Sequence, residues 1–425
     1  MADPKLKLGN DIWATKQKSL LAYNDEGGNF KSLPFQVDRI SGGTYVGRNG
    51  LVQYAASNEP RVDFLNNTKG GLLLEPQRTN YTAYSAQFEN SYWTKATSDT
   101  TANPTVTANA AIAPDGTQTA DKVDLTAPSD NNWAVVKRDS INTGATVGSK
   151  LQQSLYLKAY DSSQVGKNVD IYMYDFSNTV YKTVYNYTLT ADWERVIVEH
   201  TITGSNTSTN IQFAFGKARS SAGGSLQAET ATDFLVWGSQ LEKGSYPTSI
   251  IPTSSDAVTR VVDTCGSTDN LSTLIGQSEG TLFIDFEFFE QGTTSSYQMP
   301  IGLYNSGGSG TQNVRIDNYS GKLRIYIISS GGTIALWDSS NSISNVVANQ
   351  RYKVAIRYKN GDSVSYVNGE LYKSDSGAIS GFNLVKMVFG YANFANTLMH
   401  RGKINESKFF NEGLTNSELA TLTTI

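Results

Sequence analysis

The 425-residue chain has one cysteine, two histidines and 17% charged residues, and each scarcity excludes a class of protein. Since Cys265 has no second cysteine to pair with, no disulfide framework holds the chain together. There is no Lys/Arg-rich run and the formal net charge is −4, so the chain lacks the positive surface that nucleic-acid binding requires. No run of about 18 apolar residues predicts a membrane-spanning helix. The first nine residues lack the apolar core of a secretory signal, so we expect synthesis in a cytoplasm.

Familiar catalytic motifs are also missing. His200 and His400 have no serine or cysteine motif beside them, and the chain has no nucleophile elbow, no P-loop and no Cys-x-x-Cys pair. Cys265 lies in the Ser/Thr/Gly-rich stretch 254–280, which we interpret as holding a linker, and we expect its thiol to be a spectator. The sequence therefore predicts a protein that is not an enzyme.

Turn and strand residues are plentiful instead. The chain has 37 Gly, 23 Tyr and 17 Phe, together with many Ser, Thr and Asn residues. Ser, Asn and Gly favour turns, while Tyr, Phe and Thr favour strands, so the composition predicts an all-β fold. The length suggests roughly three segments or domains.

Residues 81–262 are expected to form an antiparallel β-sandwich. Short segments of alternating apolar and polar residues are separated by turn residues, a pattern that is typical of such sandwiches. These segments span residues 154–159, 169–174, 193–200, 210–215 and 233–237. Trp237 alternates with Leu235, so we expect it to be buried.

Residues 263–425 are expected to form a second sandwich, with strands at 280–289, 321–328 and 351–358. Asn360-Gly361 and Asn368-Gly369 predict hairpins with type I′ turns, because such turns need positive φ at both central positions. Thr415-Asn-Ser-Glu418 is a capping box that predicts a short helix at 417–422. By contrast, residues 1–80 have too few apolar runs for a core of their own, and we interpret them as an irregular anchoring or packing segment.

Two motifs far apart in the chain carry a resemblance to known proteins. One is Gly70-Gly-Leu-Leu-Leu-Glu-Pro-Gln-Arg-Thr-Asn80, and the other runs from Phe234 through Trp-Gly-Ser-Gln-Leu-Glu242 to Thr253. Together with the leader at 39–64, they resemble a pairing found in bacteriophage fibre, spike and head-decoration subunits that carry carbohydrate-binding-module-like β-sandwiches. The hairpin at 365–371 resembles the concanavalin A-like, laminin-G-type jelly roll.

The resemblance implies a structural phage virion protein, a tail or head fibre or capsid-decoration subunit that adheres to host-surface or environmental glycans. It also implies that residues 1–80 dock on other virion proteins and that the chain forms a homo-oligomer such as a trimer. Such a protein is assembled in the host cytoplasm and released by lysis.

Glycan binding needs a flat aromatic ring and polar groups beside it. Trp133, in Asp130-Asn-Asn-Trp-Ala134, and Trp337, in Leu336-Trp-Asp338, have that local composition. Tyr391 with Asn393 and Asn396 is a third candidate. The alternative for each aromatic residue is a packing or capping position.

A carboxylate cluster on the strand at 280–289 offers a different function. Asp285 and Glu287 project to the same face, and Glu290 follows, so a jelly-roll glycoside hydrolase or depolymerase is one alternative. The other interpretation places both carboxylates on the ordinary solvated face of an outer strand. Phe283 and Phe289 on that face suggest that a partner covers it. A bacterial or prophage lectin without a virion is a further alternative.

No cofactor is expected apart from calcium, which often joins the loops of such sandwiches through oxygen ligands. Asp124 and Asp233 are candidate ligands, with Asp115, Asp121 and Glu242 in addition.

Overall fold

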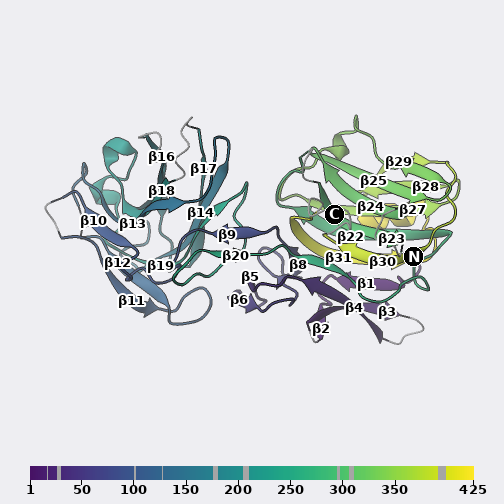
Figure 1. Ribbon diagram of the computed structural model, residues 1–425, viewed down its shortest axis with the longest axis horizontal. Coiled ribbons are helices and arrows are strands. Elements are labelled where there is room, and N and C mark those ends of the chain that lie inside the picture. The colour runs from purple at the N-terminus through teal and green to yellow at the C-terminus, as the bar shows by residue number, and fades with distance from the viewer. Residues whose placement is uncertain are drawn as a thin grey trace. The chain divides into compact units, whose positions relative to one another are not determined.

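The computed structural model describes residues 1–16, 18–25, 30–99, 102–126, 128–175, 180–203, 210–293, 297–305, 311–390 and 399–425. Strands dominate these residues, and α1 (Asn416–Thr423) is their one α-helix, which confirms the all-β prediction. The chain divides into two compact units. Unit 1 contains residues 1–77 and 261–425, and unit 2 contains residues 78–260 (Figure 1).

Unit 2 is a β-sandwich of two five-stranded antiparallel sheets, in the orders β10-β13-β18-β15-β16 and β11-β12-β19-β14-β17. One apolar cluster from both sheets forms its core. The expected alternating segments fall within β14, β15, β18 and β19, and the segment 193–200 matches β17 except that Trp193 precedes it; Trp237 is 6% exposed, as predicted. The strands are β9 (Arg78–Asn80), β10 (Thr94–Thr97), β11 (Thr105–Ala111), β12 (Ala120–Asp124), β13 (Ala134–Asn142), β14 (Lys150–Ala159), β15 (Asn168–Asp175), β16 (Val180–Thr188), β17 (Glu194–Thr201), β18 (Asn210–Lys217), β19 (Asp233–Lys243) and β20 (Val258–Arg260).

Unit 1 is built mainly from one hydrogen-bonded series of strands around a second apolar core, while β5 and β6 form a separate two-stranded sheet. The order is β26-β25-β24-β23-β30-β21-β4-β3-β1-β31-β22-β27-β28-β29. The strands are β1 (Leu6–Gly9), β2 (Ala14–Lys16), β3 (Ser19–Asp25), β4 (Phe30–Asp38), β5 (Gly43–Val46), β6 (Val52–Ala55), β7 (Val62–Asp63), β8 (Gly71–Leu74), β21 (Thr264–Ser267), β22 (Glu279–Phe288), β23 (Gln298–Asn305), β24 (Asn313–Tyr319), β25 (Lys322–Ser329), β26 (Gly332–Ala335), β27 (Arg351–Lys359), β28 (Ser363–Val367), β29 (Glu370–Asp375), β30 (Leu384–Phe389) and β31 (Gly402–Phe410).

The N-terminal segment is more regular than predicted. Its strands β4, β3 and β1 link β21 to β31 and so complete the series of unit 1. Figure 1 shows β1, in purple, beside β31, in yellow. Leu6, Leu20 and Phe35 from these strands lie in the same core cluster as Ile284. Residues 1–77 therefore form part of the sandwich with 261–425. Cys265, expected in a linker, lies in strand β21 and is 2% exposed.

The two Asn-Gly turns differ. Asn368 and Gly369 have φ of 52° and 88°, the pair of positive values predicted for a two-residue turn between β28 and β29. At the other turn Gly361 has a φ of 71°, but Asn360 does not have a positive φ. The connection from β27 to β28 is three residues long, so the type I′ prediction is wrong there. The Asp362 N–H donates to the Lys359 carbonyl at 3.0 Å, and a glycine with positive φ at the third position of such a turn is typical of type II.

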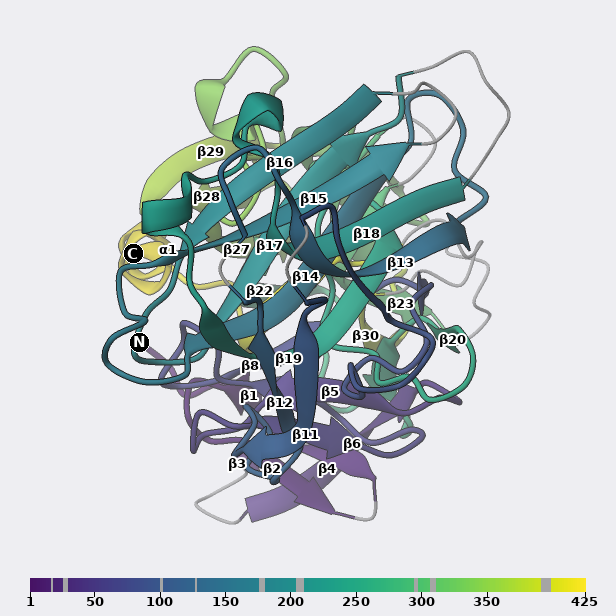
Figure 2. The same ribbon diagram turned by 90° about the vertical axis from the view of Figure 1, so that its left-hand side faces the viewer.

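Helix α1 begins with the predicted capping box. The Thr415 hydroxyl accepts from the Glu418 N–H, and the Glu418 carboxylate accepts from the Thr415 N–H at 2.9 Å. The helix packs Leu419 against Phe283, which is 1% exposed, so the partner expected over Phe283 is the chain's own C-terminal helix. Figure 2 shows α1 next to β27 and β28. Among the described residues, no helix has the length and apolar character needed to cross a bilayer.

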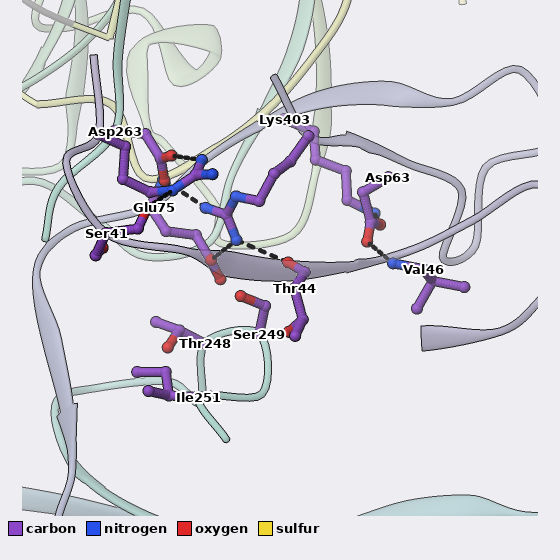
Figure 3. A network of polar contacts seen from close by, with 12 residues as sticks. Ser41, Thr44, Val46, Asp63, Glu75, Thr248, Ser249, Ile251, Asp263 and Lys403 are labelled. Carbon is purple, nitrogen blue, oxygen red and sulfur yellow. Dashed lines mark hydrogen bonds and ion pairs between the residues drawn. The ribbon is translucent and has the colours of Figure 1, made fainter. Parts of the chain in front are cut away.

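Four fully buried charged side chains join the N-terminal segment to the start of the C-terminal part. Arg39 Nη1 lies 2.8 Å from Asp263 Oδ1, and Arg61 pairs with both Asp263 and Glu75. Arg61 also donates to the Thr44 carbonyl, and Figure 3 shows Thr44, Glu75 and Asp263 converging on this network. Burial works against the charge of Arg61, but the carboxylates of Asp263 and Glu75 outweigh it and raise the arginine's pKa.

Replacing Asp263 by Asn should lower the free energy of unfolding of unit 1 by about 3–5 kcal/mol, because two buried guanidinium groups then lose their shared counter-charge. Urea denaturation of the full chain measures the loss. The control is Asp11→Asn, which removes the exposed Arg48–Asp11 pair and should cost less than about 1 kcal/mol. Equal effects of the two substitutions would contradict a structural function for the buried network.

A buried histidine makes unit 1 sensitive to acid. His400 is fully buried, and its ring lies edge-on to Phe286 and Phe288 with centroids 6.1 and 5.2 Å away. Burial lowers the pKa of His400 to about 3. In the unfolded chain a histidine titrates near pH 6.5, so protons bind the unfolded state first as pH falls. The stability contributed by neutral His400 is therefore complete above pH 6.5 and is lost as pH falls toward 3.

Substituting His400 by Leu should remove this pH dependence. Between pH 6.5 and pH 5 the wild type should lose about 1.5–2 kcal/mol relative to the variant, since the unfolded state alone gains a proton. Hydrogen exchange of the β22 and β31 amides, at pH 6.5 and at pH 5, measures the change in unfolding free energy for each protein. Parallel pH curves for the two proteins would rule out His400 as the titrating group.

Candidate functional site

The two motifs that carry the phage resemblance meet in unit 2 through the Asn80 side chain, which is fully buried. Asn80 Nδ2 donates to the carbonyls of Ser239 and Ile251, both at 3.0 Å. Asn80 Oδ1 accepts from the N–H groups of Thr82 and Leu241, both at 3.1 Å. The end of the first motif therefore fixes the strand and exit loop of the second.

Within the second motif, Gln240 and Glu242 hold the loop that follows. Gln240 Nε2 donates to the carbonyls of Thr248 and Ser249, and Glu242 Oε2 accepts from the Thr248 N–H at 2.8 Å. Glu242 is fully buried, and this burial raises its pKa. Gln240 and Glu242 therefore hold the loop at Thr248 and Ser249 in place. The Glu242 carboxylate already accepts hydrogen bonds from this loop, so its oxygens are engaged within the fold.

The calcium candidates are also engaged within unit 2. Asp233 pairs with Lys122 at 2.7 Å, and Asp124 and Asp115 each accept from a backbone N–H two residues further along. Asp121 is 1% exposed and accepts from two backbone N–H groups, while burial raises its pKa to about 6. No group of three or more His, Cys, Asp or Glu residues in the described part of the chain is arranged to hold a metal ion.

Asp285 of β22 does not lie on an ordinary solvated face. β22 is central, between β27 and β31, and Asp285 is 1% exposed. Arg351 Nε donates to both Asp285 oxygens at 2.8 and 3.0 Å, and Asn405 donates to one of them at 3.1 Å. The solvated-face interpretation is wrong for Asp285, because strands on both sides supply side chains that cover it.

The other two carboxylates have different surroundings. Glu287 is half-buried, and burial raises its pKa although Lys403 lies nearby. Glu290 pairs with Arg401. The side chain of Asp285 is thus held by an arginine and an amide, which occupy the oxygens that a nucleophile would need.

Trp133 lies on the outward side of the β10-β13-β18-β15-β16 sheet. Its ring is half-buried against Val135 and Tyr172, and the Lys137 ammonium lies 5.7 Å from the ring centroid. Its polar neighbours fold the loop: Asp130 accepts from the Gln227 N–H and Asn132 accepts from the Ser98 hydroxyl. This arrangement favours the packing alternative for Trp133. Tyr391, Asn393 and Asn396 lie outside the described residues.

Trp337 belongs to a different kind of surface, on unit 1. β25 alternates strictly: Leu323, Ile325 and Ile327 are fully buried, whereas Arg324 and Tyr326 face outward. Cross-strand register adds Asp317 opposite Arg324 and Arg315 opposite Tyr326 on β24. On the other side of β25, Ala335 pairs with Tyr326, and Trp337 follows two residues later. With Tyr297 and Tyr319, these outward side chains form the aromatic–arginine cluster: Tyr297, Arg315, Asp317, Tyr319, Arg324, Tyr326 and Trp337.

Arg324 is the centre of this cluster. Its guanidinium carbon lies 4.2 Å from the Tyr319 ring centroid and 5.4, 5.5 and 5.9 Å from those of Tyr326, Tyr297 and Trp337. The Tyr297 and Tyr319 rings meet edge to face with centroids 4.6 Å apart. Such contacts between a cation and aromatic faces fix the plane of the guanidinium.

Asp317 connects the two arginines. Its carboxylate accepts from Arg324 Nε at 2.6 Å and from Arg315 Nε at 3.3 Å, and its side chain is 4% exposed. Arg315 also lies over the Tyr326 ring at 5.1 Å and donates to Asn313. The salt bridges orient both guanidinium groups with their Nε atoms inward.

Several donors of the cluster remain unused. Among the described residues, neither the amino nitrogens of Arg324 nor the hydroxyls of Tyr297, Tyr319 and Tyr326 take part in a hydrogen bond, and these four side chains are partly exposed. The indole N–H of Trp337 also has no partner there, but its nitrogen is buried, because the ring packs against the core of unit 1. A surface with flat rings and free donors can pack against the C–H face of a sugar while it binds hydroxyl groups.

Sequence reasoning singled out Trp337 but missed the other six residues. The alternation of β24 and β25 does indicate which residues face outward, namely Arg315, Asp317, Arg324 and Tyr326. Arginine and tyrosine at such positions are a usable signal, because a solvated face usually has small polar residues there. The cross-strand register that brings them together is not visible in the sequence.

No protein-family model matches the chain, and no curated protein matches it either. Solved structures give distant matches. The carbohydrate-binding module CBM40 of the Ruminococcus gnavus IT-sialidase, bound to α2,3-sialyllactose, is 17% identical with a TM-score of 0.30, and the match covers 37% of this chain and 91% of that one. Domain 4 of the extracellular arabinanase AbnA from Geobacillus stearothermophilus, in complex with arabinotriose, is 12% identical with a TM-score of 0.31, over 42% and 82%. The SAP-like pentraxin of Limulus polyphemus is 16% identical with a TM-score of 0.27, over 34% and 68%. At these scores the chain is assigned to none of their families.

Proposed function

We propose that the chain is a structural subunit of a bacteriophage virion that adheres to glycans, and that the aromatic–arginine cluster of unit 1 is its binding surface. The observation that carries the proposal is the combination of partly exposed Tyr319, Tyr326 and Trp337 rings with donors that have no partner in the described part of the chain. The resemblance of the leader and of the two motifs supports the virion context.

The chemistry of a sugar ring suits this surface. A pyranose has an apolar face of C–H groups that packs on an aromatic ring, and hydroxyls around its edge that need donors and acceptors. The free hydroxyls of Tyr297, Tyr319 and Tyr326 lie beside the rings, and sites of this kind derive their specificity from a few placed polar groups. The cluster has one carboxylate, Asp317, held by two arginines, whereas glycoside hydrolysis needs a pair of carboxyl groups. Binding without bond cleavage is the activity that these residues support best.

The two alternative functions, a glycoside hydrolase and a lectin outside a virion, make different predictions. A jelly-roll hydrolase would use Asp285 and Glu287, so product release from a glycan should stop in Glu287→Gln. A bacterial or prophage lectin would bind the same sugars without belonging to a particle.

Trp337→Ala should weaken binding of the full chain to the glycans it recognises on an array by at least tenfold, or about 1.4 kcal/mol, because tryptophan has the largest ring of the cluster for contact with a ligand. Titration calorimetry with the best array ligand measures the loss. Tyr319→Ala, which removes a ring further from the core, should also weaken binding.

Trp133→Ala is the matched control for this experiment, since it removes a half-buried tryptophan from the outward face of unit 2. Its affinity should stay within about twofold of the wild type. If Trp133→Ala abolishes binding and Trp337→Ala does not, the binding surface is on unit 2 and this assignment is wrong. If the intact chain binds no glycan, adhesion to glycans is excluded.

The virion proposal predicts that the chain is present in purified phage particles at a fixed copy number, measured by quantitative mass spectrometry against the major capsid protein. Ile40, Tyr54 and Leu65 in the N-terminal segment are 77%, 66% and 52% exposed, which suits a surface that docks on other virion proteins. A homo-oligomer such as a trimer should then be visible by native mass spectrometry. Absence of the chain from particles would overturn the virion proposal and leave the lectin alternative.

A further inference from the structure

We infer that the aromatic–arginine cluster binds a sugar that carries a carboxylate, with the two amino nitrogens of Arg324 as donors to its oxygens. This inference rests on the proposed function and specifies the chemical class of the ligand.

The first observation is the orientation of Arg324. Its Nε donates to Asp317 at 2.6 Å, so the side of the guanidinium nearest the strand is occupied. The Tyr319 ring lies against the group at 4.2 Å, and three further rings surround it. What remains available are the in-plane N–H groups of Nη1 and Nη2, which have no partner among the described residues. Two parallel N–H donors in one plane match the two oxygens of a carboxylate better than they match a single hydroxyl.

The second observation is the local charge. Within the cluster, Arg315 and Arg324 contribute two positive charges and Asp317 contributes one negative charge, which leaves a surplus of one positive charge. The chain as a whole has a net charge of −4, so the positive charge of the cluster contrasts with the negative charge of the whole chain. A polyanion would not be held by the rest of the surface, whereas one carboxylate at the cluster would be.

The third observation is the degree of burial. The Arg324 side chain is 15% exposed and that of Asp317 is 4% exposed. Charge-assisted hydrogen bonds are stronger where water is partly excluded, and the surrounding rings provide that exclusion. The same rings are in place to contact the sugar that bears the carboxylate, and the neighbouring phenol hydroxyls can bind its hydroxyl groups.

The test compares acidic sugars with their uncharged counterparts on the full chain. Trigalacturonate and its methyl ester form one pair, and sialyllactose and lactose form the other, so the two pairs distinguish a uronic acid from a sialic acid. In at least one pair the acid should bind at least tenfold more tightly, and added salt should reduce the difference.

Arg324→Gln should weaken binding of the preferred acid at least tenfold and change binding of its neutral counterpart less than twofold. Arg324→Lys keeps the charge but loses the two-pronged geometry, so it should recover only part of the affinity. Lys322→Gln is the matched control, because Lys322 stands on the same face of β25 but its ammonium already binds Ser339 and Asn345. This control should bind the acid within about twofold of the wild type.

The outcomes separate the two proposals. If acid and neutral sugar bind equally and Trp337→Ala weakens both, the carboxylate inference is wrong and glycan adhesion stands. The inference is also overturned if Lys322→Gln and Arg324→Gln have equal effects, or if sulfated sugars bind and carboxylated ones do not. Binding of no sugar at all would remove both proposals.

Discussion

Unit 1 depends on the buried contact between the N-terminal segment and Asp263. In sequence, Arg39 precedes the β5–β6 hairpin, Arg61 follows it, and Glu75 comes directly after β8. Asp263 lies near the start of residues 261–425, where the chain returns to unit 1 from unit 2. Charges buried this deeply are favourable only when each has its partners, so the four residues specify one arrangement of three distant stretches of chain. With that arrangement fixed, β4 pairs with β21 and β1 pairs with β31.

This contact gives a physical reason for the motifs that mark the chain. Glu75 belongs to the first motif and closes the ion network of unit 1, while Asn80, five residues later, holds the second motif together in unit 2. The polar residues of both motifs therefore have a structural function, because they join segments of chain that are distant in sequence. The binding surface proposed for the molecule lies elsewhere, on strands whose sequence is unremarkable apart from its aromatic and arginine residues.

Local patterns predicted much of the fold. The alternation in β22, β25 and β27 identified these strands, and the capping box at Thr415 identified α1, because both signals depend on neighbours in sequence. The insertion of β1, β3 and β4 into the sandwich was not predicted, since β1 and β4 pair with β31 and β21, which are more than 200 residues away. Asp285 was misjudged for the same reason, as the residues that bury it come from β27 and β31. Trp337 was recognised as a candidate, but its neighbours were found only through the register of β24, β25 and β26.

The division of unit 1 into two stretches of sequence has a consequence for biosynthesis. Residues 78–260, which are 183 residues by subtraction, must be translated before the partners of β1 and β4 begin to emerge. At about 5–20 residues per second, the ribosome needs roughly 10–40 s for this stretch. Unit 2 can fold on the nascent chain during that time, whereas β1 and β4 must each wait for the strand that pairs with their outer edge. Unit 1 is complete only when β31 and α1 have left the exit tunnel.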